Sequence, residues 1–188
     1  QQVSSAASDV YKRQLTHWES PDPRDLGEDF IEFTRRLARP TWITVKGEDR
    51  TRRRAIVTLL HGNEPSGLKA VFDLLKSGET PRTDLGILVA SVNAALEDPP
   101  FSHRFLPDEK DLNRCFRTPA TTDQEHLASA IRTCIEEFAP EAVIDTHNTS
   151  GHSEAFAVAT RDDAATIQLA QRFTRRLVVL DLKLGTLI

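Results

Sequence analysis

The sequence predicts an α/β fold with a largely parallel sheet, and three observations support this prediction. Residues 55–92 combine an apolar run, a turn with glycine, apolar residues at helical spacing and a second apolar run, which is the pattern of a βαβ unit. A length of 188 residues suits one domain with a sizeable core. Hydrophobic residues at 39% and charged residues at 28% are typical of an ordinary soluble globular chain, which argues against disordered and collagen-like proteins.

Charge and hydropathy exclude two further classes of protein. The 24 Lys and Arg residues against 28 Asp and Glu residues give a net charge of −4, which argues against a nucleic-acid coat protein. No apolar run approaches the roughly 18 residues of a membrane-spanning helix, so we expect no membrane insertion.

Residues 1–14 are polar and unlike a secretory signal, so we expect a cytoplasmic protein. Cys115 and Cys134 lie outside any C-x-x-C pattern, so we expect reduced thiols.

The remaining elements extend the βαβ unit on both sides. Residues 1–25 lack a sustained period, so we expect a loose leader there and a domain over residues 26–188. Two strands separated by a polar stretch with Gly47 suggest a hairpin. The expected helices are 28–38, 68–78, 127–138 and 163–175, and the expected strands are 42–45, 54–60, 85–92, 142–145, 155–159 and 177–182. The polar stretch 99–119 is long for a loop, and such loops are often functional.

Three candidate metal ligands follow two expected strands. His61 and Glu64 come directly after the strand that ends at residue 60, and His147 follows the strand that ends at residue 145. Ligands of open α/β sheets bind at the carboxyl ends of strands. Two imidazoles and a carboxylate leave a fourth position for water in a catalytic zinc site. Each residue alone fits an ordinary solvated polar group, and only their conjunction indicates a metal site.

Four other polar residues are candidates for supporting roles. Asp145 lies two residues before His147 on the same side of its strand, where it would either orient that histidine or cap the strand end. Arg104 is a candidate for stabilising an oxyanion near the metal. Asn113 and Arg114 form a candidate clamp for a carboxylate. Arginines in polar loops are also often plain solvated surface residues.

Three motifs in this order carry a resemblance to a known family. His61-Gly62-Asn63-Glu64-Pro65-Ser66-Gly67, Asp111-Leu112-Asn113-Arg114-Cys115-Phe116 and Asp145-Thr146-His147-Asn148-Thr149-Ser150 resemble the succinylglutamate desuccinylase/aspartoacylase family of the zinc carboxypeptidase clan. The resemblance implies a carboxypeptidase-like three-layer α/β/α fold with a mixed sheet. It also implies one Zn²⁺ per chain on His61, Glu64 and His147, a carboxylate grip by Asn113 and Arg114, and a scissile carbonyl polarised by Arg104.

The family resemblance further implies a glutamate that acts as general base, which we expect beyond Ile188. Glu154 is a weaker candidate for this base, and its alternative role is that of a loop carboxylate. We therefore expect a catalytic domain truncated at its C-terminus. Residues 1–14 match nothing in the family.

These observations predict a zinc-dependent hydrolase that cleaves an amide or ester bond in a small N-acyl amino-acid-like substrate with a carboxylate. The alternative is a metal-binding or ligand-binding domain without turnover, because the general base is missing. A serine esterase is disfavoured, since Ser66 and Ser150 are not in a G-x-S-x-G turn. The acyl group, the amino acid and the oligomeric state leave no sign in the sequence.

Overall fold

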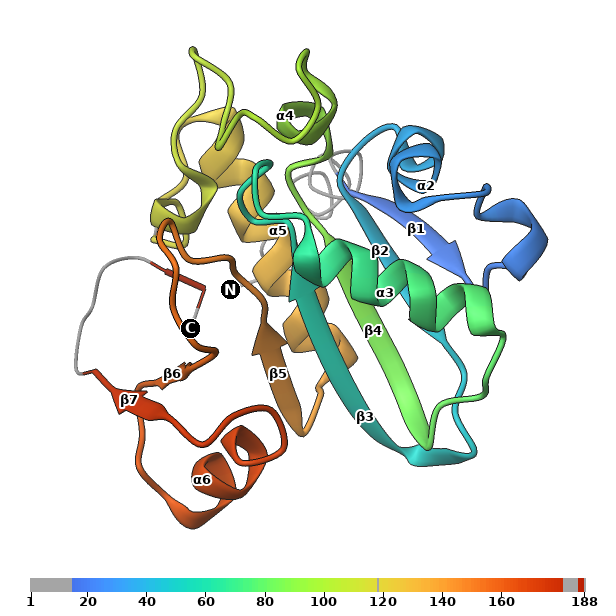
Figure 1. Ribbon diagram of the computed structural model, residues 1–188, viewed down its shortest axis with the longest axis vertical. Coiled ribbons are helices and arrows are strands. Elements are labelled where there is room, and N and C mark those ends of the chain that lie inside the picture. Colours follow the sequence, from blue (N-terminus) through green and yellow to red (C-terminus); the bar gives the residue numbers. More distant parts are fainter. Residues whose placement is uncertain (1–14, 118, 181–185, 188) are drawn as a thin grey trace, which may run out of the picture.

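One five-stranded sheet organises the part of the chain that the computed structural model describes, residues 15–117, 119–180 and 186–187 (Figure 1). In sheet order the strands are β1 (Thr16–Glu19), β2 (Thr41–Val45), β4 (Thr83–Val89), β3 (Asp49–Thr58) and β5 (Ala142–Asp145). The pair β2–β4 is antiparallel and the other pairs are parallel. The prediction of a mixed, mostly parallel sheet is confirmed. A small parallel sheet pairs β6 (Ala157–Ala159) with β7 (Leu177–Val179).

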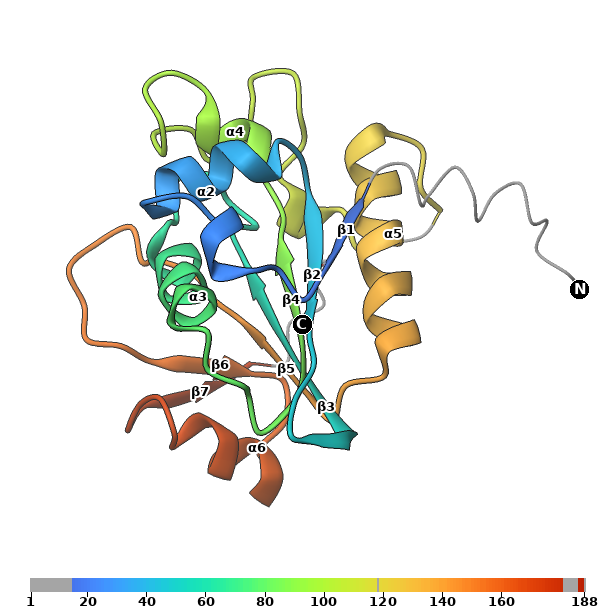
Figure 2. The ribbon, with the colours of Figure 1, turned by 90° about the vertical axis from the view of Figure 1, so that its right-hand side faces the viewer.

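Helices cover both faces of the large sheet, which gives three layers (Figure 2). On one face lie α2 (Phe30–Leu37) and α3 (Ser66–Ser77), and on the other lies α5 (Asp123–Phe138). The short α4 (Val92–Leu96) follows β4, and α6 (Ala164–Ala170) lies beside the small sheet. Short 3-10 turns occupy Pro23–Asp25 and Leu112–Arg114. None of the described helices is long and apolar enough to cross a lipid bilayer.

Apolar residues on alternate sides of β4 explain why both faces of the sheet are covered. Ile87 and Val89 pack in the cluster formed with α2 and α3, whereas Leu88 packs in the cluster formed with α5. All three side chains are fully buried. Successive residues of a strand point to opposite faces, so a strand that is apolar on both sides requires a helical layer on each.

The expected hairpin between the strands at 42–45 and 54–60 is wrong, because β4 lies between β2 and β3. β4 pairs with β2 through Thr41↔Val89 and with β3 through Thr58↔Val89. An apolar strand buries most surface at the centre of a sheet, because neighbouring strands cover both of its edges and helices cover both of its faces. The turn at residues 46–48 therefore leads the chain past the position that β4 later fills.

The expected loose leader differs from the structure over its second half. β1 belongs to the large sheet, and Trp18 stacks on Phe33 of α2 with ring centroids 6.4 Å apart. Residues 1–14 lie outside the described residues. The sequence of residues 15–25 shows no clear apolar pattern, because β1 is a four-residue edge strand whose side chains are at most half buried.

The ends of several expected elements shift by a few residues. The strand expected at 85–92 ends at Val89, and the chain then bends so that the amide of Ala90 donates to the carbonyl of Thr58. β6 and α6 are shorter than expected, and part of the strand expected at 177–182 lies outside the described residues. The described residues of the stretch 99–119, which exclude residue 118, are irregular apart from the 3-10 turn, as expected.

Candidate metal centre

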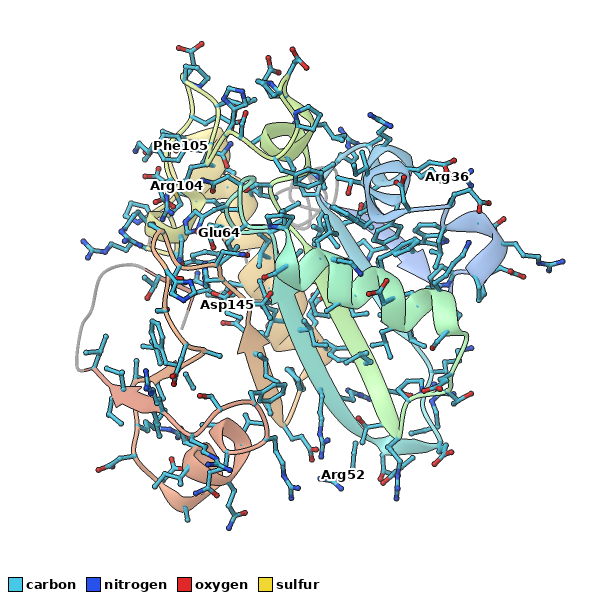
Figure 3. The ribbon with its side chains drawn as sticks, in the orientation of Figure 1. Arg36, Arg52, Glu64, Arg104, Phe105 and Asp145 are labelled. Atoms are coloured by element: carbon cyan, nitrogen blue, oxygen red, sulfur yellow. The ribbon has the colours of Figure 1, made fainter. Side chains whose placement is uncertain are left out.

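The candidate ligands meet because β3 and β5 are parallel neighbours. Val57 of β3 stands opposite Asp145 of β5, so the loops that follow these strands leave the same edge of the sheet. The loop after β3 carries His61 and Glu64, and the loop after β5 carries His147. Figure 3 shows Glu64, Asp145 and Arg104 gathered at this edge, on the side away from Arg52.

The three candidate ligands offer nitrogen and oxygen atoms that all lie within 4.8 Å of one another. Glu64 lies between the two imidazoles: its Oε1 is 3.0 Å from Nδ1 of His61, and its Oε2 is 2.8 Å from Nδ1 of His147. His61 and Glu64 are buried, whereas the side chain of His147 is 32% exposed. The cluster therefore has a closed side toward the core and an open side toward solvent, which is the form of a site that receives a ligand.

His61 has one ring nitrogen without a hydrogen bond although it is buried. Its Nε2 lies 3.0 Å from Oδ1 of Asp111, and a carboxylate accepts the proton of that nitrogen. In the tautomer with the proton on Nε2, Nδ1 carries a lone pair, and it has no hydrogen bond although Oε1 of Glu64 lies 3.0 Å away. An unpartnered buried nitrogen beside a carboxylate fits a metal ion that both atoms would bind.

The electrostatics of the cluster favour a positive charge. Burial alone would raise the pKa of Glu64, but the hydrogen bonds from His147 and from the amide of Asn148, together with the neighbouring His61 ring, outweigh it and lower the pKa below its usual range. Burial alone would lower the pKa of His147, but its hydrogen bonds with Asp145 and Glu64 outweigh it and raise the pKa to about 10. The two carboxylates thus stabilise a positive charge on the imidazole of His147.

Asp145 contacts the far side of the His147 ring. Its Oδ2 lies 2.9 Å from Nε2 of His147, and the carboxylate is only 7% exposed. Burial raises the pKa of Asp145, partly offset by the hydrogen bond with His147. The contact fixes the orientation of the ring with Nδ1 toward Glu64, which is the geometry expected for a residue that orients a metal ligand.

Arg104 reaches the cluster from the loop after α4. Its Nη1 donates to Oε1 of Glu64 at 3.2 Å, and its Nη2 donates to Oδ2 of Asp111 at 3.2 Å. The same Nη2 is 2.8 Å from Nε2 of His61. The side chain of Arg104 is 39% exposed, so part of it lies on the open side of the cluster. An arginine in this place carries donors for an anionic group next to the three candidate ligands.

Gly62 allows the loop with Arg104 to lie against the loop with His61. A Cβ atom at Gly62 would stand 2.6 Å from the carbonyl oxygen of His103 and 2.7 Å from the backbone of Ala94. The amide of Gly62 donates to the carbonyl of Arg104 at 2.9 Å. A residue without a side chain is therefore required for this close approach of two backbone segments.

Among the described residues, neither Asn113 nor Arg114 forms a hydrogen bond or ion pair with any of the three candidate ligands. The Oδ1 atom of Asn113 accepts from the amide of Leu187 at 3.3 Å. The guanidinium of Arg114 is exposed and donates to the adjacent carbonyl of Asn113. Glu154, the weaker candidate for a base, forms an ion pair with Arg176 at 2.7 Å.

Asp111 and Asn148 belong to this site although the sequence, which carries both in the quoted motifs, assigned neither of them a role. Asp111 accepts from His61 and Arg104, and the amide of Asn148 donates to Glu64. A signal for Asp111 was present, because it is the first residue of the motif at residues 111–116. Asn148 carried no signal for its contact with Glu64, since that contact uses the backbone amide.

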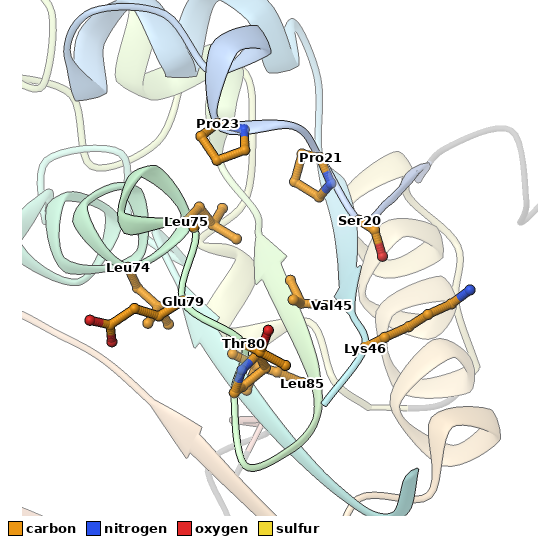
Figure 4. Close-up of a pocket in the computed structure, with 12 residues that line it drawn as sticks. Ser20, Pro21, Pro23, Val45, Lys46, Leu74, Leu75, Glu79, Thr80 and Leu85 are labelled. Atoms are coloured by element: carbon orange, nitrogen blue, oxygen red, sulfur yellow. The ribbon is translucent and has the colours of Figure 1, made fainter. Parts of the chain in front are cut away.

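A cavity of about 200 Å³ lies away from the candidate ligands (Figure 4). Its walls come from α3, from β2 and β4, and from residues 20–23, with Leu75, Val45 and Leu85 among the apolar lining. None of the candidate site residues lines it. The chemistry-bearing residues are instead gathered at the carboxyl edge of β3 and β5.

Comparisons with known proteins give a family and a fold. Residues 50–185 match the family model described as the succinylglutamate desuccinylase/aspartoacylase catalytic domain. A solved succinylglutamate desuccinylase from Vibrio cholerae is similar with a TM-score of 0.61 and 15% identity, over 86% of this chain and 58% of that one. Another from Vibrio parahaemolyticus has a TM-score of 0.46 and 18% identity, over 59% of this chain and 40% of that one. None of the curated proteins matches the sequence. The chain thus spans less than two thirds of the length of either solved structure.

Proposed function

The chain belongs to the succinylglutamate desuccinylase/aspartoacylase family, and on that premise we propose that it is a zinc-dependent hydrolase. Its substrate would be a small N-acyl amino-acid-like molecule that bears a carboxylate, cleaved at an amide or ester bond. The observation that carries this proposal is the convergence of His61, Glu64 and His147 within 4.8 Å at the carboxyl edge of the sheet.

Zinc fits this set of donors better than a hard cation does. Two imidazole nitrogens and one carboxylate are the ligands of many catalytic zinc sites, whereas calcium and magnesium prefer oxygen alone. The unpartnered Nδ1 of His61 supports the same choice. When bound, zinc supplies a Lewis acid that activates water for attack on a carbonyl.

The side chains around the metal position would bind and orient the substrate. Arg104 carries donors on the open side of the cluster, where they would stabilise negative charge on the carbonyl oxygen during attack. We assign Asn113 and Arg114 to the substrate carboxylate, because the exposed guanidinium of Arg114 has no carboxylate partner among the described ion pairs. A substrate carboxylate held by these two side chains would convert binding energy into orientation of the scissile bond.

Zinc content is the first test of this proposal. We expect about one zinc per purified chain, and loss of the metal in His61→Ala and His147→Ala variants. His17→Ala is the matched control, because His17 is an exposed histidine in β1, remote in sequence from the cluster. Stoichiometric zinc in His147→Ala would contradict the assignment of three ligands.

Hydrolysis is the second test. We expect the zinc-loaded chain, or a C-terminally extended form of it, to release free amino acid from N-succinyl or N-acetyl amino acids. Replacement of Arg104 with Lys should lower kcat, and replacement of Arg114 with Ala should mainly raise KM. Bound zinc without turnover in both forms would favour the alternative, a metal-binding domain.

A further inference from the structure

We propose that Asn148 is a positioning residue that holds His147 and Glu64 in place for the metal ion by tying the loop after β5 to the amino end of α3. This inference rests on the metal centre proposed above. The loop after β3 carries His61 and Glu64, the loop after β5 carries His147, and the two loops must be kept at a fixed separation. Zinc requires a fixed separation, since its bonds to nitrogen and oxygen are all about 2.0–2.2 Å long.

The chain is fixed to β3 just before His147. Both the amide and the Oγ1 hydroxyl of Thr146 donate to the carbonyl oxygen of Val57, at 2.9 and 3.0 Å. These bonds continue the pairing of β5 with β3 one residue past the end of the strand. These two hydrogen bonds fix the backbone on the N-terminal side of His147.

Asn148 fixes the other flank of His147 to a different element. Its Oδ1 accepts from the Oγ hydroxyl of Ser66 at 2.8 Å and from the amide of Ser66 at 3.3 Å. Its own amide donates to Oε2 of Glu64 at 3.0 Å. Beyond it the exposed loop bonds to itself, with Thr149 donating to the carbonyl of Gly151.

The amino end of α3 needs the acceptor that Asn148 provides. The N-cap residue, Pro65, makes no side-chain cap hydrogen bond, so the amide of Ser66 would otherwise be one of the free amides of the first turn. Gly67 brings the two segments together, because a Cβ atom there would overlap the Oγ1 atom of Thr146. Asn148 therefore acts as a cap supplied by another loop, and Glu64 lies between the two segments.

Zinc affinity of the whole chain tests this inference. The dissociation constant for zinc, measured by competition with a chelating dye, should rise about tenfold in Asn148→Ala, as is usual when a residue supporting a metal ligand is removed. Asn148→Asp should restore most of the affinity, since a carboxylate oxygen accepts from the same two donors of Ser66. Thr149→Ala is the matched control, because it removes a hydrogen bond within the same loop.

A double-mutant cycle separates positioning from a general loss of stability. Ser66→Ala should weaken zinc binding less than Asn148→Ala, and the double variant should bind zinc no more weakly than Asn148→Ala alone. All titrations are made well below the metal-free unfolding midpoint of every variant. A residue that only stabilised α3 would change that midpoint and leave the zinc affinity unchanged.

The outcomes distinguish this inference from the proposed function. A wild-type chain that binds no zinc would overturn the metal centre and this inference with it. Zinc bound equally by the wild type, Asn148→Ala and Thr149→Ala would overturn the positioning role alone. An Asn148→Asp variant as weak as Asn148→Ala would also overturn it, because the tie would then not depend on the oxygen acceptor.

Discussion

At the scale of single residues, the two ring nitrogens of His61 face different carboxylates. Nε2 faces Asp111 at 3.0 Å, and Nδ1 faces Glu64 without a hydrogen bond. Asp111 also accepts from Arg104, so one carboxylate orients both a candidate metal ligand and the candidate residue for stabilising the oxyanion. The proposed roles of His61 and Arg104 thus depend on Asp111.

We expect Asp111→Ala to weaken zinc binding by about 10–100-fold, because His61 loses the acceptor that fixes its ring and its tautomer. Equilibrium zinc titration measures this effect. Asp108→Ala is the control, since Asp108 is an exposed carboxylate of the same loop. Equal affinities of the two variants would contradict the role given to Asp111.

We expect Gly62→Ala to lower the free energy of unfolding by about 1–3 kcal/mol, because the added methyl group meets backbone atoms that cannot rotate away. Denaturant titration measures this. Gly151→Ala is the matched control, since nothing lies within 4 Å of a Cβ atom built there. The Gly62 variant should also lose activity, because the loop that carries Arg104 must move. A Gly62→Ala variant as stable as Gly151→Ala would show that these loops are not in close contact.

At the scale of elements, the amino end of α5 shows how a local sequence signal is joined by a distant partner. Thr122 and Glu125 form a reciprocal capping box, in which each side chain bonds to the backbone of the other. Lys110, from the loop that carries Arg104, forms an ion pair with Glu125 at 2.9 Å. Hydrogen bonds from Lys110 and then from Thr121 hold the pKa of Glu125 well below its usual range.

This lowered pKa predicts how stability depends on pH. A group whose pKa is lower in the folded state stabilises the fold above its unfolded pKa of about 4.3, and this contribution is lost as the pH falls. Wild type should therefore be more stable than Glu125→Gln at pH 7, and the difference should shrink below about pH 4. Thermal unfolding across this range measures it, with Glu136→Gln, an exposed residue of the same helix, as the control. A difference that does not change with pH would contradict the prediction.

Most elements could be predicted from the sequence because their signals are local. The helix caps, the 3.6-residue spacing of apolar residues in α3 and the β-branched runs of β3 and β4 depend only on neighbours along the chain. The position of β4 between β2 and β3 had no local signal. The order of strands in a sheet depends on which arrangement buries most apolar surface, and the sequence of a single strand does not determine that arrangement.

At the scale of the whole molecule, the sheet separates two apolar clusters that share its central strand. Ile87 and Val89 belong to one cluster and Leu88 to the other, so β4 links α2 and α3 with α5. The candidate metal centre lies at the carboxyl edge of the same sheet, on loops that leave β3 and β5. The rigidity of the site therefore depends on the packing of both faces.

We expect Leu88→Ala to lower the free energy of unfolding by about 2–5 kcal/mol, because the fully buried side chain would leave a cavity against α5. Leu74→Ala is the chemically matched control, since Leu74 of α3 is 36% exposed. Denaturant titration compares the two variants, and the loss should be clearly smaller for Leu74→Ala. Equal losses would show that β4 is not the buried centre of the sheet.

The sequence by itself determined the fold class, most of the elements, the family and the three candidate ligands, because each is carried by local periodicity or by short motifs. Only the tertiary structure decided the strand order, the contacts of Asp111 with His61, and the tie between Asn148 and Ser66. These contacts join residues that are 50 and 82 positions apart. Such distant pairs form only when the sheet brings loop ends together, so neither partner carries a signal of the other along the chain.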